Sequence, residues 1–185
     1  TNTDSNFIVT FSVTDGALVV NPAELKLTVN DYSEVYDGEA HGDAATTDVT
    51  AGTTIEYKVN GGAWTTTKPT ITDVGTKTVE VRAINANYET ATGSYTLTVS
   101  PLEIAVEIIE ASKSVTYTGE EYSVNGYEVS KSEDLYDESK VEYKGDASKL
   151  TVKGTNVGNY PMNLLGSEFT NTDSNFIVTF SVTDG

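Results

Sequence analysis

Cysteine and glutamine are absent from the 185 residues of this chain, and histidine, tryptophan and methionine occur once each. Without cysteine the chain can form neither disulfides nor thiolate metal sites. The two absences together also exclude Cys–Gln thioester and Thr–Gln ester crosslinks. No apolar run is long enough to span a bilayer. These residues contain no signal peptide, which a secreted precursor could still have carried. Core burial, or some other crosslink, must therefore stabilise the fold.

Basic residues are scarce as well: 11 Lys and Arg face 28 Asp and Glu, giving a net charge of −17. A field of that sign repels nucleic acid and anionic membranes, so we expect neither nucleic-acid binding nor membrane insertion. The acidity is best interpreted as a device for solubility.

What the chain does contain is an internal repeat. The sixteen residues Thr1–Gly16 recur letter for letter as Thr170–Gly185, an offset of 170 − 1 = 169 residues. Self-similarity at a fixed period is the mark of an array protein. The offset is too long for a solenoid unit, so each period is expected to hold one or two whole domains. We expect the chain to represent one period of a longer tandem array.

Residues 1–21 are predicted to be a terminal hairpin that belongs to a preceding repeat. Phe7–Thr14 is rich in β-branched and aromatic residues. Asp15-Gly16 is a strong two-residue hairpin signal, because a type I′ turn needs positive φ at both positions. Ala17–Val20 would return as the second arm, and Pro22 would end it.

Two β domains are predicted to follow, at residues 22–100 and 101–185. The strands expected in the first alternate apolar and polar residues and are separated by Gly- and Asn-rich turns; they are 25–29, 54–59, 63–65, 77–83 and 94–99. Those expected in the second are 102–108, 127–129, 141–143, 150–152, 159–165 and 176–183, with one helical turn within 130–139.

Both domains carry the same markers in the same order. Each begins with x-Pro, continues with Tyr-x-Gly and Thr-x-Val-Gly, and closes with Asn-aromatic and a strand. Short strands with regular turn signals favour an all-β fold of two tandem, small, Ig-like β-sandwiches. A β-grasp-like fold with a short helix near Leu135 is the alternative for the second.

The second set of markers, Tyr117-Thr-Gly119, Asn156–Tyr160 and Asn175–Gly185, resembles the MBG-type repeats of bacterial surface adhesins. The first domain, with Tyr36-Asp-Gly38 and Pro69–Gly75, is similar to Ig-like relatives of that family. The resemblance implies a secreted or cell-wall-anchored protein, from a Gram-positive bacterium, with stacked β domains in a stalk or adhesive region. It carries over no binding residue.

Two constellations are candidate sites. Trp64, Tyr57 and Tyr32 could form a platform on which a sugar ring stacks, although aromatics in small β domains are mostly core residues. Lys26, with Asn87 or Asn85 and with Glu80 or Glu56, could form a Lys–Asn isopeptide bond, which needs a buried lysine and a carboxyl as proton shuttle.

Metal chemistry and catalysis have little support. His41, beside acidic residues on a Gly-rich turn, is more often a solvated loop residue than a ligand. Asp4-Ser5-Asn6 and its copy at 173–175 could offer oxygens to Ca²⁺, but an Asx turn is favoured. No Ser-His-Asp set or phosphate loop is present, so we expect no enzyme, no metal and no cofactor.

The predicted function is therefore a stalk or spacer repeat that projects a terminal adhesive domain from a bacterial cell surface. The alternative is a binding module for a glycan or host protein around Trp64. The expected partners are neighbouring repeats of the same chain. The repeated sixteen-residue segment, which we call the seam, also predicts head-to-tail strand addition, in which Phe7–Val20 of one molecule complements the edge near Phe176–Val182 of another.

Overall fold

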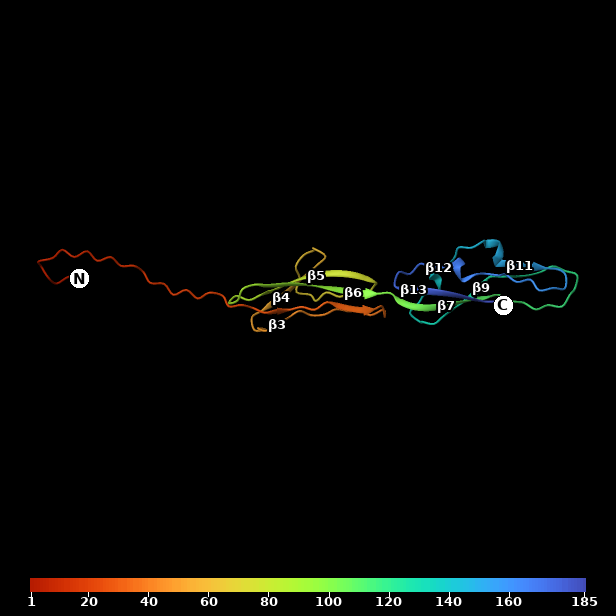
Figure 1. Ribbon diagram of the computed structural model, residues 1–185, viewed down its shortest axis with the longest axis horizontal. Helices are drawn as coiled ribbons and strands as arrows, with labels where there is room; N and C mark the ends of the chain where they lie inside the picture. The colour runs from red at the N-terminus through yellow and green to blue at the C-terminus, as the bar shows by residue number, and fades with distance from the viewer.

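The computed structural model describes all 185 residues and contains strands and three short 3-10 helices, but no α-helix. Figure 1 shows two β units arranged end to end, preceded by an extended N-terminal tail. We call residues 23–100 the first unit and residues 101–185 the second unit. The all-β class agrees with the prediction, and none of the helices could cross a membrane.

The first unit is built on a four-stranded sheet in the order β2-β6-β5-β4, with β1 and β3 paired beside it. β2 runs parallel to β6, and the other pairs are antiparallel. The strands are β1 Leu27–Thr28, β2 Tyr32–Val35, β3 Thr46–Thr47, β4 Thr54–Val59, β5 Gly75–Ile84 and β6 Ala91–Ser100. Alternation along β5 buries Val79, Val81 and Ala83, as the sequence predicts.

The second unit contains a three-stranded sheet in the order β13-β7-β9 and two two-stranded pairs, β10-β12 and β11-β8. β7 Leu102–Glu110 pairs in parallel with β13 Phe176–Thr183. The other elements are β8 Tyr122–Asn125, β9 Tyr127–Lys131, β10 Val141–Tyr143, β11 Thr151–Gly154 and β12 Phe169–Asn171, with 3-10 helices η1 Glu138–Lys140, η2 Ala147–Leu150 and η3 Gly166–Glu168.

Each unit has its own core. The buried cluster of the first unit gathers around Val79, Tyr95 and Leu97, and that of the second around Val106, Ile108 and Tyr136. The buried positions of β7, which include Ile104, follow the predicted alternation. Several small sheets are formed, and the finer assignment to Ig-like sandwiches stays a prediction. The α-helix that a β-grasp fold requires is not present.

The turn after β4 illustrates how local sequence fixes structure. Asn60 and Gly61 both have positive φ, 47° and 76°. The Gly62 N–H donates to the Val59 carbonyl at 2.9 Å, which closes a two-residue turn. Positive φ at both central positions defines type I′, the turn that Asn-Gly favours. The predicted return of the chain through 63–65 is confirmed by the bridge between Tyr57 and Thr65.

The predicted N-terminal hairpin is not formed. Residues 1–22 contain no strand, and the side chains of Phe7, Ile8 and Leu18 are 68%, 102% and 91% exposed. The reason is that no sheet or core of this chain lies against the segment, and a two-stranded hairpin alone is at best marginally stable in water. The identical sequence at Phe176–Thr183 is a strand because β7 lies beside it.

The strand expected at 159–165 is also wrong. Pro161 has no N–H to give to a ladder, and Asn163 has a φ of 57°, which a strand does not accommodate. Met162 and Leu164 are nevertheless buried. The Leu164 N–H donates at 2.7 Å to Oε1 of the buried Glu110 rather than to a neighbouring strand. The helical turn expected within 130–139 is found only at the end of that range, where the 3-10 helix η1 begins at Glu138.

Candidate functional site

The junction between the two units combines a short connection, aromatic packing and hydrogen bonds. β6 ends at Ser100 and β7 begins at Leu102, so Pro101 alone separates them. The φ of proline is fixed near −65°, which removes a degree of freedom at that point. A one-residue connection of this kind leaves little room for independent motion of the units.

Aromatic packing bridges the junction. The ring of Tyr36, from the first unit, meets Phe176 of the second edge-on, with centroids 5.3 Å apart. Phe176 in turn contacts the buried Tyr136 at 5.1 Å in the same geometry. Tyr36 packs against both hydrophobic cores. Edge-to-face pairs add about 0.5–1.5 kcal/mol beyond the area they bury.

Hydrogen bonds fix the relative orientation of the units. Asn175 Oδ1 accepts from the Val74 backbone N–H at 2.8 Å, and Asn175 Nδ2 donates to Asp73 Oδ1 at 3.3 Å. Within the first unit, the Tyr36 N–H donates to the Ser100 carbonyl at 2.8 Å, which holds Tyr36 beside the connecting proline. One asparagine of the second unit is thus held by two groups of a single turn in the first.

The sequence markers meet at this junction. Tyr36-Asp37-Gly38 and Thr72–Gly75 come from the end of the first unit, and Asn175-Phe176 comes from the start of the second. Sequence reasoning identified each motif as a turn or strand edge but missed that together they join one unit to the next. The available signal was their recurrence in the same order in both halves of the chain.

The predicted stacking platform is not assembled. Tyr57 is only 5% exposed and belongs to the first core, so its ring is not available to a ligand. The hydroxyl of Tyr32 lies 3.1 Å from His41 Nδ1, and the two rings stack. Trp64 is partly buried on the outer side of β4 and β5. The three residues therefore do not form one contiguous aromatic surface.

Charged side chains surround Trp64 instead. Arg82 Cζ lies 4.4 Å and Lys58 Nζ 5.1 Å from the indole centroid, within the range of cation–π attraction. Arg82 pairs with Glu56 at 2.6 Å, and Lys58 pairs with Glu80 at 2.7 Å. Both pairs join cross-strand neighbours of β4 and β5. The only tryptophan thus lies within a small network of mixed charge.

The isopeptide residues are not brought together. Lys26 and Asn87 are both exposed, whereas the reaction needs a buried lysine. Glu80 is paired with Lys58, and no hydrogen bond or ion pair joins Lys26 to Glu80, Asn85 or Asn87. Asn85 is buried but donates to the Ala51 carbonyl and the Thr53 hydroxyl.

His41 is occupied by hydrogen bonds of the fold. Its Nε2 lies 2.7 Å from Asp37 Oδ1, and its Nδ1 faces Tyr32. The hydrogen bond from His41, followed by that from the Glu39 backbone N–H, lowers the pKa of Asp37. No group of three or more His, Cys, Asp or Glu side chains lies close enough to hold a metal ion.

The Asp-Ser-Asn segments form the expected Asx turns. The Asn6 N–H donates to Asp4 Oδ1 at 2.9 Å, and in the second copy the Asn175 N–H donates to Asp173 Oδ1, also at 2.9 Å. An Asx turn of this kind precedes β13, which begins at Phe176. Asp173 therefore orients Asn175, the residue that holds the junction.

Comparisons with known proteins are sparse. No protein-family model and no curated protein matches the sequence. Among solved structures, one match is the Bacteroides ovatus mixed-linkage glucan utilization locus protein SGBP-B in complex with a mixed-linkage heptasaccharide, with a TM-score of 0.36 and 11% identity. The match covers 85% of this chain and 47% of that one, so the chain spans about half of that structure.

Proposed function

We propose that this chain is a non-catalytic spacer from a tandem-repeat protein of a bacterial cell surface, and that its two β units act as a stiff rod. The packed junction is the observation that carries the proposal. A one-residue connection, an aromatic bridge and a doubly bonded asparagine all restrain the same hinge. The cell-surface location follows from the resemblance to adhesin repeats.

The elongated shape supports the same function. The units lie end to end, so each added period would extend the molecule (Figure 1). The net charge of −17 keeps such an array soluble and disfavours collapse of one repeat onto another. The mechanism is mechanical, because the number of periods and the stiffness of each junction set how far a terminal domain projects.

The test is a distance distribution across the junction. Since the chain has no cysteine, spin labels attach only at introduced positions, and the exposed Lys68 and Lys144 suit one label in each unit. We expect a single narrow distribution by pulsed electron paramagnetic resonance. Asn175→Ala combined with Tyr36→Ala should broaden it, and Asn6→Ala, in the identical but unpacked copy, should not. A broad distribution in the unmodified junction would refute the rod.

A second candidate is a glycan-binding surface around Trp64. The observation in its favour is that the only tryptophan lies partly exposed on an outer sheet face, beside two cations and two carboxylates that could bond sugar hydroxyls. Mixed-linkage glucan oligosaccharides, the ligand class named for the similar structure, are the first probes. Saturable binding that Trp64→Ala abolishes and Trp64→Phe retains would favour this function over the spacer.

A further inference from the structure

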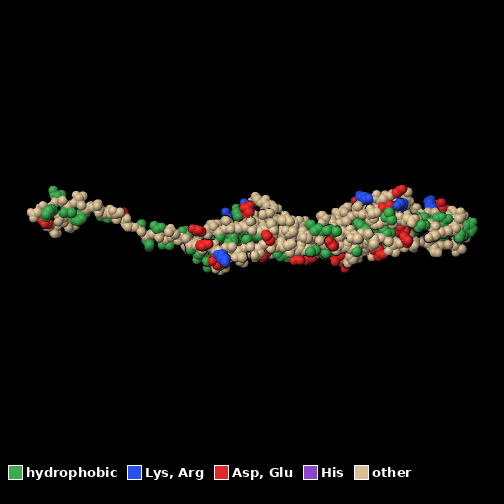
Figure 2. All heavy atoms as spheres, in the orientation of Figure 1, with side chains coloured by type: hydrophobic (Ala, Val, Ile, Leu, Met, Phe, Trp, Pro, Cys, Tyr) green, Lys and Arg blue, Asp and Glu red, His purple; other side chains and the backbone are tan.

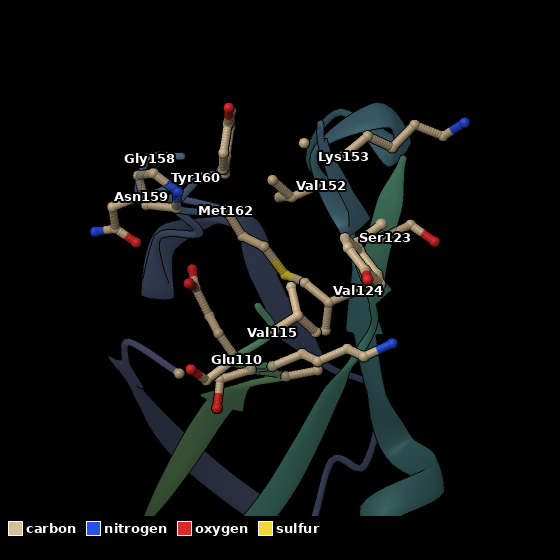
Figure 3. A pocket seen from close by; sticks show the side chains of 18 of the residues that line it. Glu110, Val115, Ser123, Val124, Val152, Lys153, Gly158, Asn159, Tyr160 and Met162 are labelled. Atoms are coloured by element: carbon tan, nitrogen blue, oxygen red, sulfur yellow. The ribbon is translucent and has the colours of Figure 1, made fainter. Parts of the chain in front are cut away.

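The far end of the second unit contains an open groove of about 450 Å³. Its floor is apolar: Met162 points into it between Val115, Val124 and Val152, as Figure 3 shows. Hydrophobic side chains also gather at this tip of the molecule in Figure 2. Val157, Tyr117 and Val115 are 89%, 61% and 46% exposed there.

One wall of the groove is a backbone segment that pairs with no strand. Residues 112–117 form no strand and make no backbone–backbone hydrogen bond, although they continue directly from β7. β13, which pairs with β7 throughout its length, ends beside this wall at Thr183. Asp184 and Gly185 line the groove. The position of the next strand segment is therefore open, in line with β13.

The first unit shows what occupies the corresponding position. There β6 continues past Leu97 and Val99, which are 0% and 2% exposed, to Ser100 and Pro101. Its parallel register with β2 brings Pro101 opposite Tyr36, whose N–H donates to the Ser100 carbonyl. In the first unit, Leu-x-Val-x-Pro thus closes the core and ends beside the tyrosine of Tyr-x-Gly.

The seam supplies the same pattern. Gly185 corresponds to Gly16, and Gly16 is followed by Ala17-Leu18-Val19-Val20-Asn21-Pro22. If the β13–β7 register, in which Thr183 faces Ile109, is continued, Ala17 falls opposite Ser112 and Pro22 opposite Tyr117. Tyr117 begins the second Tyr-x-Gly, and Gly119 has a φ of 84° against 81° at Gly38. The proline therefore lies opposite the tyrosine in both units, Pro101 opposite Tyr36 and Pro22 opposite Tyr117, with no shift in the pairing of the strands.

From these observations we infer that the groove is a docking site for Ala17–Pro22 of a second copy of this chain. Leu18 and Val20 take the places that Leu97 and Val99 occupy in the first unit. In the free chain they are 91% and 83% exposed, so the donor segment is available.

The buried residues of β7 are even-numbered, Ile104, Val106 and Ile108, but the odd-numbered Val115 lines the groove, so the inward face changes after Glu110. Val20, opposite Val115 in this register, faces the groove with it, and Val19 faces outward. Asp15-Gly16 lets the rest of the donor tail turn away from the Gly185 already in place.

Continuity with the existing junction specifies a whole second copy rather than an unrelated peptide. Ala23 follows the docked segment, and its N–H donates to the Asn87 carbonyl at 3.0 Å, as the Leu102 N–H donates to the Asn175 carbonyl at 3.0 Å. Asn87 of the incoming copy thus stands where Asn175 stands at the internal junction. It meets Val157, the counterpart of Val74 in the second Thr-x-Val-Gly. The docked pair repeats the internal junction.

The primary experiment measures self-association of the full chain by sedimentation equilibrium over a wide range of concentration. We expect head-to-tail association that Leu18→Asp with Val20→Asp weakens by at least about 100-fold, because two buried apolar contacts are lost. These variants alter an exposed tail and leave both cores intact. Val19→Asp is the matched control and should associate like the parent. A parent that stays monomeric, a double variant that associates normally, or an effect confined to Val19 would overturn the inference.

A second arm tests the groove itself. Adding Ala-Leu-Val-Val-Asn-Pro after Gly185 should fill the groove of the same molecule, raise the Tm of the second unit and abolish association. The same extension with Asp in place of its Leu and of its second Val should do neither. If the extended variant is more stable than the parent chain but the parent never associates, the groove is filled by a segment that follows covalently, and the second-copy proposal is wrong. None of these outcomes depends on whether the internal junction is stiff.

Discussion

Truncation of Phe176 to alanine tests whether tertiary contacts give the seam strand its stability. Phe176 is 4% exposed, lies in the core of the second unit and meets Tyr36 and Tyr136 edge-on. Removing a buried phenylalanine costs about 3–5 kcal/mol, through lost transfer free energy and the cavity left behind. At about 1.4 kcal/mol per factor of ten, the folding equilibrium constant of the second unit should fall by roughly 10²-fold to 4 × 10³-fold.

The chain contains its own control for this experiment. Phe7 has the same neighbours in sequence for six residues before it and nine after it, but its side chain is 68% exposed. Phe7→Ala should therefore change stability by less than about 0.5 kcal/mol. Both variants are studied at concentrations where the chain is monomeric.

Urea unfolding followed by circular dichroism and by tryptophan fluorescence separates the two units. Trp64 is the only tryptophan and reports on the first unit. Phe176→Ala should shift the dichroism transition of the second unit far more than the fluorescence transition. Equal effects of Phe7→Ala and Phe176→Ala would refute the reasoning, because they would place the two copies in similar environments.

Three further predictions concern a turn and two titrations. Gly61→Ala should destabilise the first unit by about 1–2 kcal/mol, since Gly61 has a φ of 76°, whereas Gly16→Ala in the tail should have no effect on Tm. Hydrogen bonds from the Lys149 side chain and then from the Leu165 N–H lower the pKa of Glu168. The contribution of Glu168 to folding stability is therefore full above the usual glutamate pKa and is lost as pH falls through the lowered value. Glu168→Gln should therefore make the acid decline of Tm shallower, while the exposed Glu103→Gln should not. Burial, followed by the charges of Tyr57 and Asp43, raises the pKa of Tyr95 to about 12. The contribution of Tyr95 to folding stability is therefore full below the usual pKa of 10.0 and is lost as pH rises from 10.0 to about 12. An absorbance titration should show a late-ionising tyrosine that Tyr95→Phe removes.

Much of the strand content could be predicted from residue patterns. The alternation of 77–83 and 102–108 placed apolar side chains on one face, and both segments became central strands with that face buried. The pattern failed at 159–165, where burial of Met162 and Leu164 does not require a strand. Apolar periodicity reports which side chains are buried, and the backbone there follows Pro161 and the positive φ of Asn163.

The candidate sites were less predictable than the strands. Tyr57, Trp64 and Tyr32 were grouped by residue type, and the pleat then sent Tyr57 into the core while Trp64 stayed outside. The junction was hidden for a different reason. Asn175 contacts a turn 101 residues earlier in the chain, and nothing local to either segment indicates that pairing.

The two copies of the seam show where local sequence stops acting. In the first copy the Asn2 side-chain amide donates to the carbonyls of Asp4 and Phe7, and in the second the Asn171 amide donates to those of Asp173 and Phe176. In both copies the Asp carboxylate accepts from the backbone N–H of the Asn two residues later. That turn is determined by sequence alone, because every partner lies within five residues. The eight residues that follow are a strand only at 176–183, where β7 supplies the hydrogen bonds and the core covers the apolar face. A turn closes on itself, but a strand needs a neighbour, and only the tertiary structure provided one.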